Sequence, residues 1–306
     1  MRGWWQDLTD LVLPAECSGC GKPRTVLCPR CRAALGGAVP RRVRPVTEPP
    51  GLPAVHAAAV YADEVRAALL AHKERGRLAL AAPLGAALAG AVRAGLRETA
   101  TGPRPGAVSL PGEECGRSAV AVTGAARGGA PVLLVPVPSA RAAVRARGHD
   151  PARRIALAAA GELRRSGVAA RVLAVLRQRR AVSDQARLDS RQRLDNLAGA
   201  LGTVPGGARL LLAGPVVLVD DLMTTGASLR EAARAVKSAV YAARVREEMG
   251  EHRAGRPRKE GNPVYRAAEF EGADGAGDVI CAAVVAAPPD SFVDKQELTD
   301  NARRCR

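Results

Sequence analysis

The sequence predicts an α/β protein with a central, mostly parallel sheet flanked by helices, and two patterns support that fold class. Five short apolar runs have the length and composition of buried strands: residues 56–61, 131–138, 172–176, 215–219 and 279–287. Stretches with helical apolar spacing separate them: residues 64–72, 78–96, 151–165 and a long segment from about 228. Strands that alternate with helices are typical of parallel sheets, because parallel neighbours need long crossover connections.

Length and composition support a sizeable folded core. The chain has 306 residues and a mass of 31.7 kDa, which suits two domains or one large domain with an appendage. Hydrophobic residues make up 47% of it and aromatic residues only 2%. The core must therefore consist of Ala, Val and Leu. The scarcity of rings also disfavours a nucleic-acid platform that stacks several bases on aromatic side chains.

Changes in composition divide the chain into segments. A polar, cysteine-bearing N-terminal stretch is expected to form a small head, and a Pro/Gly/Arg-rich stretch is expected to be a linker. The rest is expected to be one domain with two loosely ordered insertions and a tail. The expected boundaries are 1–35 for the head, 36–55 for the linker, 56–290 for the main domain, about 99–129 and 244–278 for the insertions, and 291–306 for the tail.

Two Cys-x-x-Cys pairs occur in the head: Cys17, Cys20, Cys28 and Cys31. Each pair spans one tight turn, so both thiolates can face one ion, and four thiolates in a tetrahedron select Zn²⁺. A thioredoxin-like redox pair and unrelated thiols are the alternatives. Two matched pairs without a βαβ context favour a structural zinc site, whose metal supplies folding energy to a module with almost no core. The other cysteines are expected to be plain thiols: Cys115, Cys281 and Cys305.

The sequence predicts a cytoplasmic protein without membrane insertion. Asp7 and Asp10 come early, and no apolar run or small-residue cleavage site of a secretory signal accompanies them. The longest apolar run, residues 78–96, is rich in Ala and is interrupted by Arg93. Because Ala is too weakly apolar to drive insertion, a helix of a soluble protein is expected there.

The positive charge is carried mostly by arginine and is concentrated. The net charge is +16, and only five of the 46 basic residues are lysines. Residues 141–193 contain fourteen arginines and four acidic residues, so this span alone carries +10. Genomic base composition would raise arginine everywhere, whereas a local excess indicates phosphate binding. A cluster near the start of the span is equally compatible with a phosphate site and with a solvated helix start. Its members are Arg145, Arg147, Arg153 and Arg154.

The segment with the most chemical information follows the apolar run at 215–219. Asp220 and Asp221 end this expected strand, and a turn of small residues, Thr224-Thr225-Gly226-Ala227-Ser228, precedes a helix. Backbone amides of such a turn bind anions at the positive end of the helix, and hydroxyl groups add donors. The turn can therefore hold a phosphate monoester while the two carboxylates accept from sugar hydroxyls. An ordinary helix cap would need Ser228 alone and would explain neither the adjacent acids nor the Thr-Thr-Gly run.

With this motif the chain resembles the type I phosphoribosyltransferases, and most of all the ComF family of competence proteins. The strand, the two acids and the Thr-Thr-Gly turn are similar to the family motif that binds 5-phosphoribosyl 1-pyrophosphate (PRPP). The cysteine tetrad is similar to the zinc-binding head of ComF proteins. Further similar segments are residues 72–76, 136–138 and 145–149, together with Gln185, Arg193 and Asn196. The resemblance covers nearly the whole chain outside 99–129 and 244–278.

The resemblance implies a type I phosphoribosyltransferase fold and a role for each matching residue. The 5′-phosphate of PRPP would be held by Thr224, Thr225, Gly226, Ala227 and Ser228. Asp220 and Asp221, the expected catalytic residues, would bind the ribose hydroxyls, and Mg²⁺ would bridge ribose and pyrophosphate. The pyrophosphate side would include Arg145, Arg147 and Lys73. A hood loop over the site would include Gln185 and Arg193.

Two functions follow from the resemblance. The first is an enzyme that transfers the phosphoribosyl group of PRPP to an acceptor and releases pyrophosphate; the sequence does not identify the acceptor. The alternative is a non-catalytic PRPP sensor that handles single-stranded DNA during natural competence and contacts its backbone through the head and the arginine-rich span. A homodimer is left open. The sequence differs from the family at His149-Asp150, where an aromatic residue and Asn are usual, and the Asp150 carboxylate would repel an anion if it faced the pocket.

Overall fold

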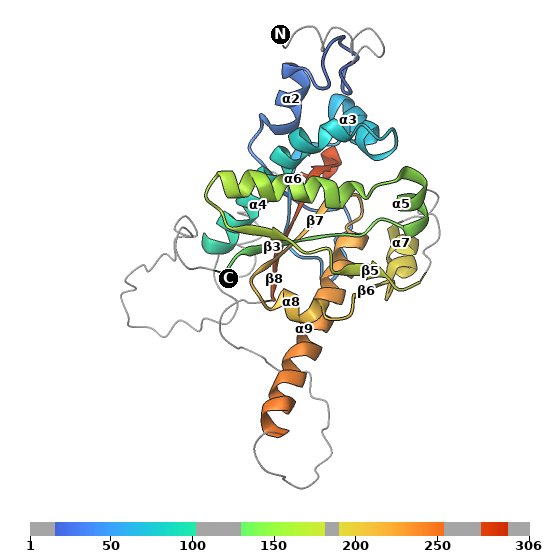
Figure 1. Cartoon of the computed structure of the whole chain (residues 1–306). Helices are drawn as coiled ribbons and strands as arrows, with labels where there is room; N and C mark the ends of the chain where they lie inside the picture. Colours follow the sequence, from blue (N-terminus) through green and yellow to red (C-terminus); the bar gives the residue numbers. More distant parts are fainter. Residues whose placement is uncertain (1–15, 102–129, 181–189, 254–276, 293–306) are drawn as a thin grey trace, which may run out of the picture.

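The computed structural model describes residues 16–101, 130–180, 190–253 and 277–292 (Figure 1). They form a six-stranded sheet in the order β1-β2-β8-β7-β3-β4, in which β1 is antiparallel to β2 and the other pairs are parallel. The strands are β1 (Arg41–Val43), β2 (Val55–Val60), β8 (Val279–Ala287), β7 (Val216–Leu222), β3 (Val132–Pro136) and β4 (Ala170–Val172). The expected α/β class with a mostly parallel sheet is confirmed.

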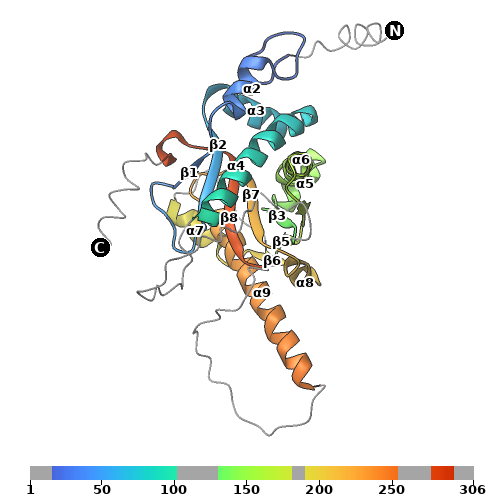
Figure 2. The same ribbon diagram turned by 90° about the vertical axis from the view of Figure 1, so that its left-hand side faces the viewer.

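Helices cover both faces of this sheet. On one face, α4 (Ala81–Thr101) and α6 (Pro151–Arg165) pack against each other and against the strands. On the other face lies α9 (Ala227–Arg253), with the short α8 (Gly207–Leu211) beside it. The C-terminal part of α9 extends beyond the sheet (Figures 1 and 2). The remaining helices are α2 (Pro29–Gly36), α3 (Asp63–Lys73), α5 (Arg141–Arg147) and α7 (Ser190–Leu197), with single 3₁₀ turns at Leu78–Leu80 and Pro289–Ser291.

The first four residues of the central strand β7 are apolar on both sides, because helices cover both faces of the sheet there. Val217 and Val219 belong to the apolar cluster shared with α4 and α6, whereas Val216 and Leu218 belong to the cluster shared with α9. Strands of a parallel sheet that is covered on both faces are continuous apolar runs rather than alternating patterns. This is why the apolar runs at 131–138, 215–219 and 279–287 correctly predicted β3, β7 and β8.

The core fills space with small residues that allow backbones to approach closely. On α4, a Cβ added at Gly85 would lie 2.4 Å from the Cβ of Ala158 on α6. The two helices therefore meet through glycine and alanine, and native packing density is reached without large rings. A chain with so few aromatic residues can form a dense interior in this way.

One expected strand is wrong. The apolar run at 172–176 is divided between two sheets: β4 ends at Val172 and pairs with β3, whereas β5 (Leu176–Gln178) pairs antiparallel with β6 (Leu201–Thr203). Both pieces are apolar and no glycine or proline separates them, so the sequence carries no signal of the change of sheet.

The segments expected to be irregular contain regular structure at their edges. Residues 36–55 include the edge strand β1, which pairs with β2. Beyond the expected start of the second insertion at 244, α9 continues to Arg253, because Arg, Glu and Met favour helices even without an apolar face. At the start of the expected tail, Ser291 O accepts from the amide of Arg44, and Phe292 forms a β-bridge with Val43. Residues 102–129, 254–276 and 293–306 lie outside the described part of the chain.

The expected head is part of the main core. Leu27, Cys31 and Leu35 belong to the same buried cluster as Leu84 and Leu88 of α4. Among the described residues, the segment Leu78–Thr101 is the one stretch long and apolar enough to cross a membrane, and 56% of its most apolar window is buried. More than half of that window is thus packed inside the protein, as in a core helix.

Candidate functional site

The four head cysteines lie together. Their sulfur atoms are all within 4.8 Å of one another, and Cys20 Sγ lies 3.6 Å from Cys28 Sγ. Four sulfurs at 2.3 Å from a single zinc ion stand about 3.8 Å apart in a tetrahedron, so the cluster has the size of a tetrathiolate site. Cys28 is the N-cap of α2, and Pro29 follows it at the first helical position. The start of α2 therefore positions Cys28 and Cys31, the second pair of cysteines.

The environment of these thiols suits a metal centre. Burial would raise the pKa of Cys17, but backbone amides, first that of Cys28 at 3.3 Å, donate to its sulfur and lower the pKa to about 6. The amide of Cys31 likewise lowers the pKa of Cys28. Burial and the neighbouring sulfurs raise the pKa of the Cys31 thiol. Four thiolates this close together would repel one another without a cation, so the cluster is suited to hold a metal ion.

The head packs on α3, which connects it to the sheet. The Arg30 guanidinium lies 2.5 Å from a carboxylate oxygen of Glu64, and a Cβ added at Gly19 would lie 3.2 Å from the Cβ of the same glutamate. A cavity of about 200 Å³ lies between the head and the later part of α3. Its lining includes Ser18, Ala71, Arg75 and Arg77. The N-terminal half of α3 is thus held by the head.

The acid pair stands at the carboxyl end of β7, between β3 and β8. Asp221 is buried on the face of the strand that carries Val217 and Val219, since residues two apart share a face. Asp220 is half-buried, and its Oδ1 accepts from the amide of Asp221 at 2.9 Å. Ligands of open α/β sheets bind at this edge, outside the carboxyl ends of the strands.

Lys73, the last residue of α3, pairs with this acid pair. Its Nζ lies 2.9 Å from Oδ2 of Asp221, and its side chain is 35% exposed. Burial would lower the pKa of Lys73, but the carboxylates of Asp221 and Asp220 raise it above its usual value. Burial and the neighbouring Asp221 raise the pKa of Asp220 well above that of an ordinary aspartate. The carboxyl groups of Asp220 and Asp221 thus both lie close to one cation of the chain itself, the ammonium group of Lys73.

The turn after β7 presents unpaired amides at the start of α9. Gly226 O accepts from the amide of Arg230 at 2.9 Å, so Gly226 caps the helix. Within the described ranges, nothing accepts from the amides of positions 224–229. Gly226 has a φ of +73°, which disfavours other residues, and a Cβ there would lie 2.9 Å from Cδ2 of Leu52. Thr224 is exposed, and Thr225 is half-buried. The geometry suits an anion that accepts hydrogen bonds.

Arg147 approaches the same region from α5, which follows β3. Its Nε lies 3.2 Å from Oε2 of Glu74, the residue after Lys73, and its side chain is only 20% exposed. Arg145, two residues earlier on α5, is exposed. The structure therefore links Arg147 to the end of α3, whereas Arg145 makes no ion pair with any described residue.

Asp150 caps a helix. Gly148, with a φ of +75°, ends α5, and Asp150 is the N-cap of α6, with its carboxylate accepting from the amide of Arg153 at 3.2 Å. Pro151 follows at the first helical position, as is common after such a cap. The Asp150 carboxylate therefore faces the first turn of α6.

The structure brings some predicted site residues together and leaves others apart. Lys73 pairs with Asp221, and Arg147 pairs with Glu74, the residue that follows Lys73. Arg193 belongs to α7, and Gln185 lies outside the described residues. The sequence reasoning missed Glu74 and Leu52. Glu74 stands in the charged segment 72–76 and offered a signal, whereas Leu52 lies in the expected linker and offered none.

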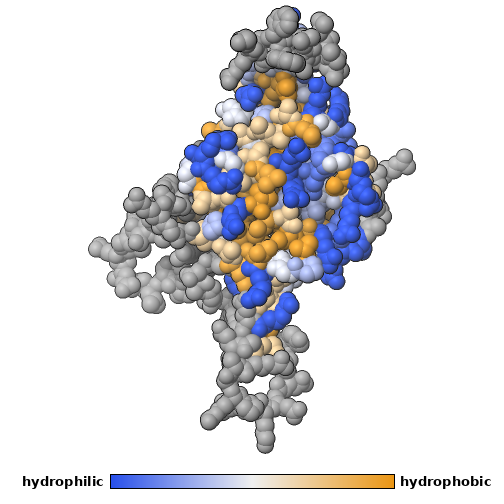
Figure 3. Space-filling view, in the orientation of Figure 1, coloured by the Kyte–Doolittle hydropathy of each residue, from blue (hydrophilic) through white to orange (hydrophobic). Residues whose placement is uncertain are grey.

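The arginine-rich span is spread over the surface. Figure 3 shows hydrophilic residues gathered on the side where α5 and the β5–β6 pair lie, and an apolar band across the middle of this face. Exposed arginines of the described span occupy both ends of α6 and its neighbours: Arg141, Arg145, Arg153, Arg154, Arg164, Arg165, Arg171, Arg177, Arg179 and Arg180. A high charge along the sequence therefore does not by itself mark one pocket.

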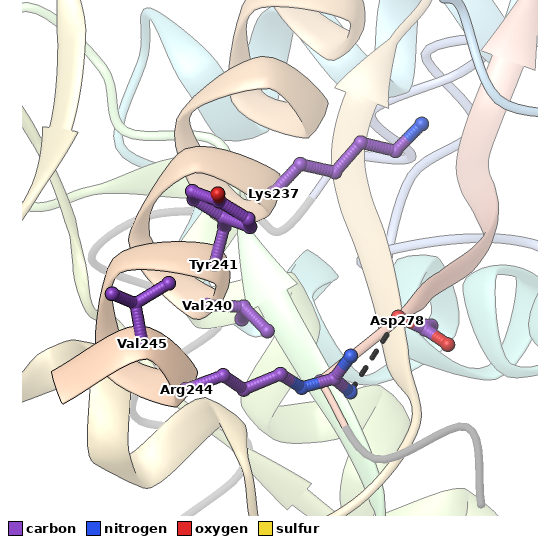
Figure 4. A pocket seen from close by; sticks show the side chains of 7 residues that line it. Lys237, Val240, Tyr241, Arg244, Val245 and Asp278 are labelled. Atoms are coloured by element: carbon purple, nitrogen blue, oxygen red, sulfur yellow. Dashed lines mark ion pairs between the residues drawn. The ribbon is translucent and has the colours of Figure 1, made fainter. Parts of the chain in front are cut away.

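A separate hollow of about 120 Å³ lies on α9 (Figure 4). It is lined by Val240, Tyr241 and Val245, and Arg244 lies 3.8 Å from Asp278 at its rim. Asp278 directly precedes β8, which is parallel to β7, so this hollow stands at the amino edge of the sheet. The acid pair stands at the opposite edge, and the hollow has no part in that site.

A scan against protein-family models finds no match for this chain, and no curated protein matches it significantly.

Proposed function

We propose that the chain is a PRPP-binding protein of the phosphoribosyltransferase type, with a structural zinc ion in its head. The observation that carries the proposal is the turn 224–228, whose unpaired amides stand at the N-terminus of α9 directly after a carboxylate pair. A phosphate monoester and a vicinal diol, joined in one ligand, match that pair of features. PRPP contains both.

Each residue has a role in this proposal. The turn, from Thr224 to Ser228, holds the 5′-phosphate, and Asp220 and Asp221 accept from the ribose hydroxyls. Lys73 and Arg147, with Arg145 at the rim, face the pyrophosphate. Mg²⁺ would enter with PRPP and would supply positive charge at the pyrophosphate, because Asp221 is already paired with Lys73 and no described carboxylate cluster forms a magnesium cage.

The reaction is a substitution at the anomeric carbon. The bond from C1′ to the pyrophosphate oxygen breaks and its electron pair leaves with pyrophosphate, while the nucleophile of the acceptor bonds to C1′. The positive charge that develops on the sugar is stabilised by the carboxylates below it, and the basic residues stabilise the leaving group. Most of the rate enhancement would come from holding the reactants dry and aligned.

Calorimetric titration of PRPP with and without Mg²⁺ tests the binding step, and pyrophosphate release in a screen of acceptor bases tests the transfer step. We expect Mg²⁺-dependent binding that Asp220→Asn/Asp221→Asn abolishes, together with a rise of the melting temperature in saturating ligand. Ribose 5-phosphate and inorganic pyrophosphate are matched partial ligands. If neither PRPP nor these fragments bind the zinc-loaded protein, the proposal is wrong.

A second candidate function, binding of single-stranded DNA, is favoured by one observation. Arg141, Arg145 and Arg154 at the start of the arginine-rich span are exposed and form no ion pair with a described residue. Such a cluster would contact phosphates without base specificity. The logarithm of the binding constant should then fall with the logarithm of the salt concentration, and a slope near zero would exclude this function. Single-stranded oligonucleotides of mixed sequence are the probe.

A further inference from the structure

His149 lies between two helix caps, the C-cap of α5 and the N-cap of α6. Gly148, in the left-handed conformation, ends α5, and Asp150 begins α6 with a hydrogen bond to its first turn. The backbone on either side of His149 is therefore fixed, and its half-buried side chain is directed onto the end of α3. None of the roles derived above uses this residue.

The imidazole contacts carbonyl oxygens with both nitrogens. Nε2 lies 3.2 Å from the carbonyl oxygen of His72, and Nδ1 lies 3.1 Å from that of Arg147. Carbonyls only accept, so a contact is a hydrogen bond only where that ring nitrogen carries a proton; a neutral imidazole has one such nitrogen and an imidazolium has two. The carbonyl of His72 is at the end of α3, where helices leave acceptors without partners, and no described backbone amide donates to it. With its proton on Nε2, His149 caps α3 from a distant segment.

The rings of the two histidines also pack together. The ring centroids of His149 and His72 lie 5.7 Å apart in an edge-to-face arrangement at 62°. His72 is buried, and its Nδ1 lies 3.3 Å from the carbonyl oxygen of Arg77. His72 is thereby held on its other side by the turn that follows α3. The ring of His149 therefore packs against a histidine, His72, that is buried and held in place.

Three consecutive residues at the end of α3 each contact a different part of the site. His72 receives the ring of His149, Lys73 pairs with Asp221, and Glu74 pairs with Arg147. The ring of His149 also contacts the carbonyl of Arg147 itself. Moving this ring would therefore shift the Lys73 backbone relative to β7 and release the α5 end that carries Arg147.

We propose that His149 is a positioning residue that joins the end of α3 to the end of α5, and so aligns Lys73 and Arg147 with the anion bound beside the acid pair. The proposal rests on the proposed PRPP site. It assigns His149 no contact with the ligand. Its effect on binding passes through the two basic side chains.

The variant His149→Phe separates hydrogen bonding from packing, because Phe keeps a ring against His72 but donates to neither carbonyl. We expect the PRPP·Mg²⁺ affinity measured by calorimetry to fall about tenfold, the change that 1.4 kcal/mol produces. The matched control is Asp150→Asn, because Asn caps helices as well as Asp does. It should bind like the wild type. His149→Gln keeps one donor and should restore part of the affinity, which a purely packing role would not allow.

A second measurement does not need PRPP. The chain has five lysines, so the rate at which an amine-reactive reagent modifies Lys73 can be followed by peptide mass spectrometry against Lys22 and Lys237 in the same sample. Pairing with Asp221 protects Lys73, and we expect His149→Phe to accelerate its modification relative to those internal standards. If the wild type does not bind PRPP but the variant exposes Lys73, the proposed function fails and the positioning role stands. If the variant changes neither affinity nor labelling, the positioning role is overturned.

Discussion

The cysteine head and the acid-pair site gather functional groups in opposite ways. The four cysteines lie within residues 17–31, and one turn plus the start of α2 brings them together. The acid-pair site joins Leu52, Lys73, Arg147 and Asp221, which come from four distant segments. A site made from neighbours in sequence can be recognised by spacing, whereas a site assembled by the sheet becomes visible only in three dimensions.

The two regions also differ in how their charge is balanced. The head concentrates four thiols, two of which have lowered pKa values, in an arrangement that suits an external cation. The acid pair carries its own cation, Lys73. The head should therefore depend on metal for its structure, whereas the acid-pair site should persist without a ligand. The following experiments test this difference, from the largest expected effect to the smallest.

Loss of a cysteine ligand should have the largest effect. We expect Cys28→Ser to remove bound zinc and to lower the melting temperature more than any substitution below, because structural zinc supplies about 10–16 kcal/mol of binding energy in small domains. Metal content by mass spectrometry and thermal unfolding measure both effects. Cys281→Ala is the control, because this thiol is buried in the sheet and outside the cluster. Equal zinc content in Cys28→Ser and wild type would contradict the metal site.

Breaking the Lys73–Asp221 pair should destabilise the fold less than the loss of a cysteine ligand. We expect Asp221→Asn to lower the free energy of unfolding by about 2–3 kcal/mol, since it leaves a mostly buried ammonium group without its anion. Lys73→Met removes that charge, so the double variant should recover part of the loss in a double-mutant cycle of denaturant unfolding. Strictly additive effects would show that the two side chains do not interact in solution.

A methyl group added at Gly226 in the turn should lower the free energy of unfolding by about 1–2 kcal/mol. Gly226→Ala introduces strain at a positive φ and also brings a Cβ against Leu52. Gly167→Ala is the matched control, because Gly167 has a φ of +84° but nothing within 4 Å of an added Cβ. The difference between the two variants in denaturant unfolding isolates the contact with Leu52. If they are equally destabilised, Leu52 does not cover the turn.

The smallest effect concerns the helix that starts at this turn. Glu231 on α9 is buried, accepts from the amide of Leu201 at 3.0 Å and pairs with Arg234 at 2.7 Å. Burial would raise the pKa of Glu231, but Arg234 and the amide of Leu201 lower it below its usual value. The carboxylate therefore stabilises the fold above the pKa of the unfolded chain, near 4.3, and this contribution is lost as the pH falls through the lower folded pKa.

We accordingly expect Glu231→Gln to be less stable than the wild type by about 1 kcal/mol at neutral pH, because Gln keeps an acceptor for the amide of Leu201 and loses only the charge that faces Arg234. The two unfolding curves should converge as the pH falls below about 4. Thermal melts between pH 3 and 8 measure the difference. A gap that stays constant down to pH 3 would show that ionisation of Glu231 is not its cause.

The sequence predicted the elements whose signals are local. The buried runs at β3, β7 and β8, the helix at 151–165 and the cysteine spacing needed no knowledge of the fold. The division of residues 172–176 between two sheets depended on partners elsewhere in the chain, and so did the edge strand β1. At the site, the resemblance placed Lys73 near the pyrophosphate, but its ion pair with Asp221 requires the end of α3 to meet the end of β7. The role of His149 was hidden for the same reason, because a lone histidine next to a glycine carries no pattern.

The shared core of head and sheet has a practical consequence for dissecting the molecule. Leu27, Cys31 and Leu35 pack in the same cluster as Leu69 of α3 and Leu84 of α4. A shortened protein that begins after residue 36 would expose that apolar surface to water, and large exposed apolar surfaces promote aggregation. The head therefore cannot be treated as a removable tag when the sheet is studied alone. Any division of labour between them has to be probed by point substitutions in the intact chain.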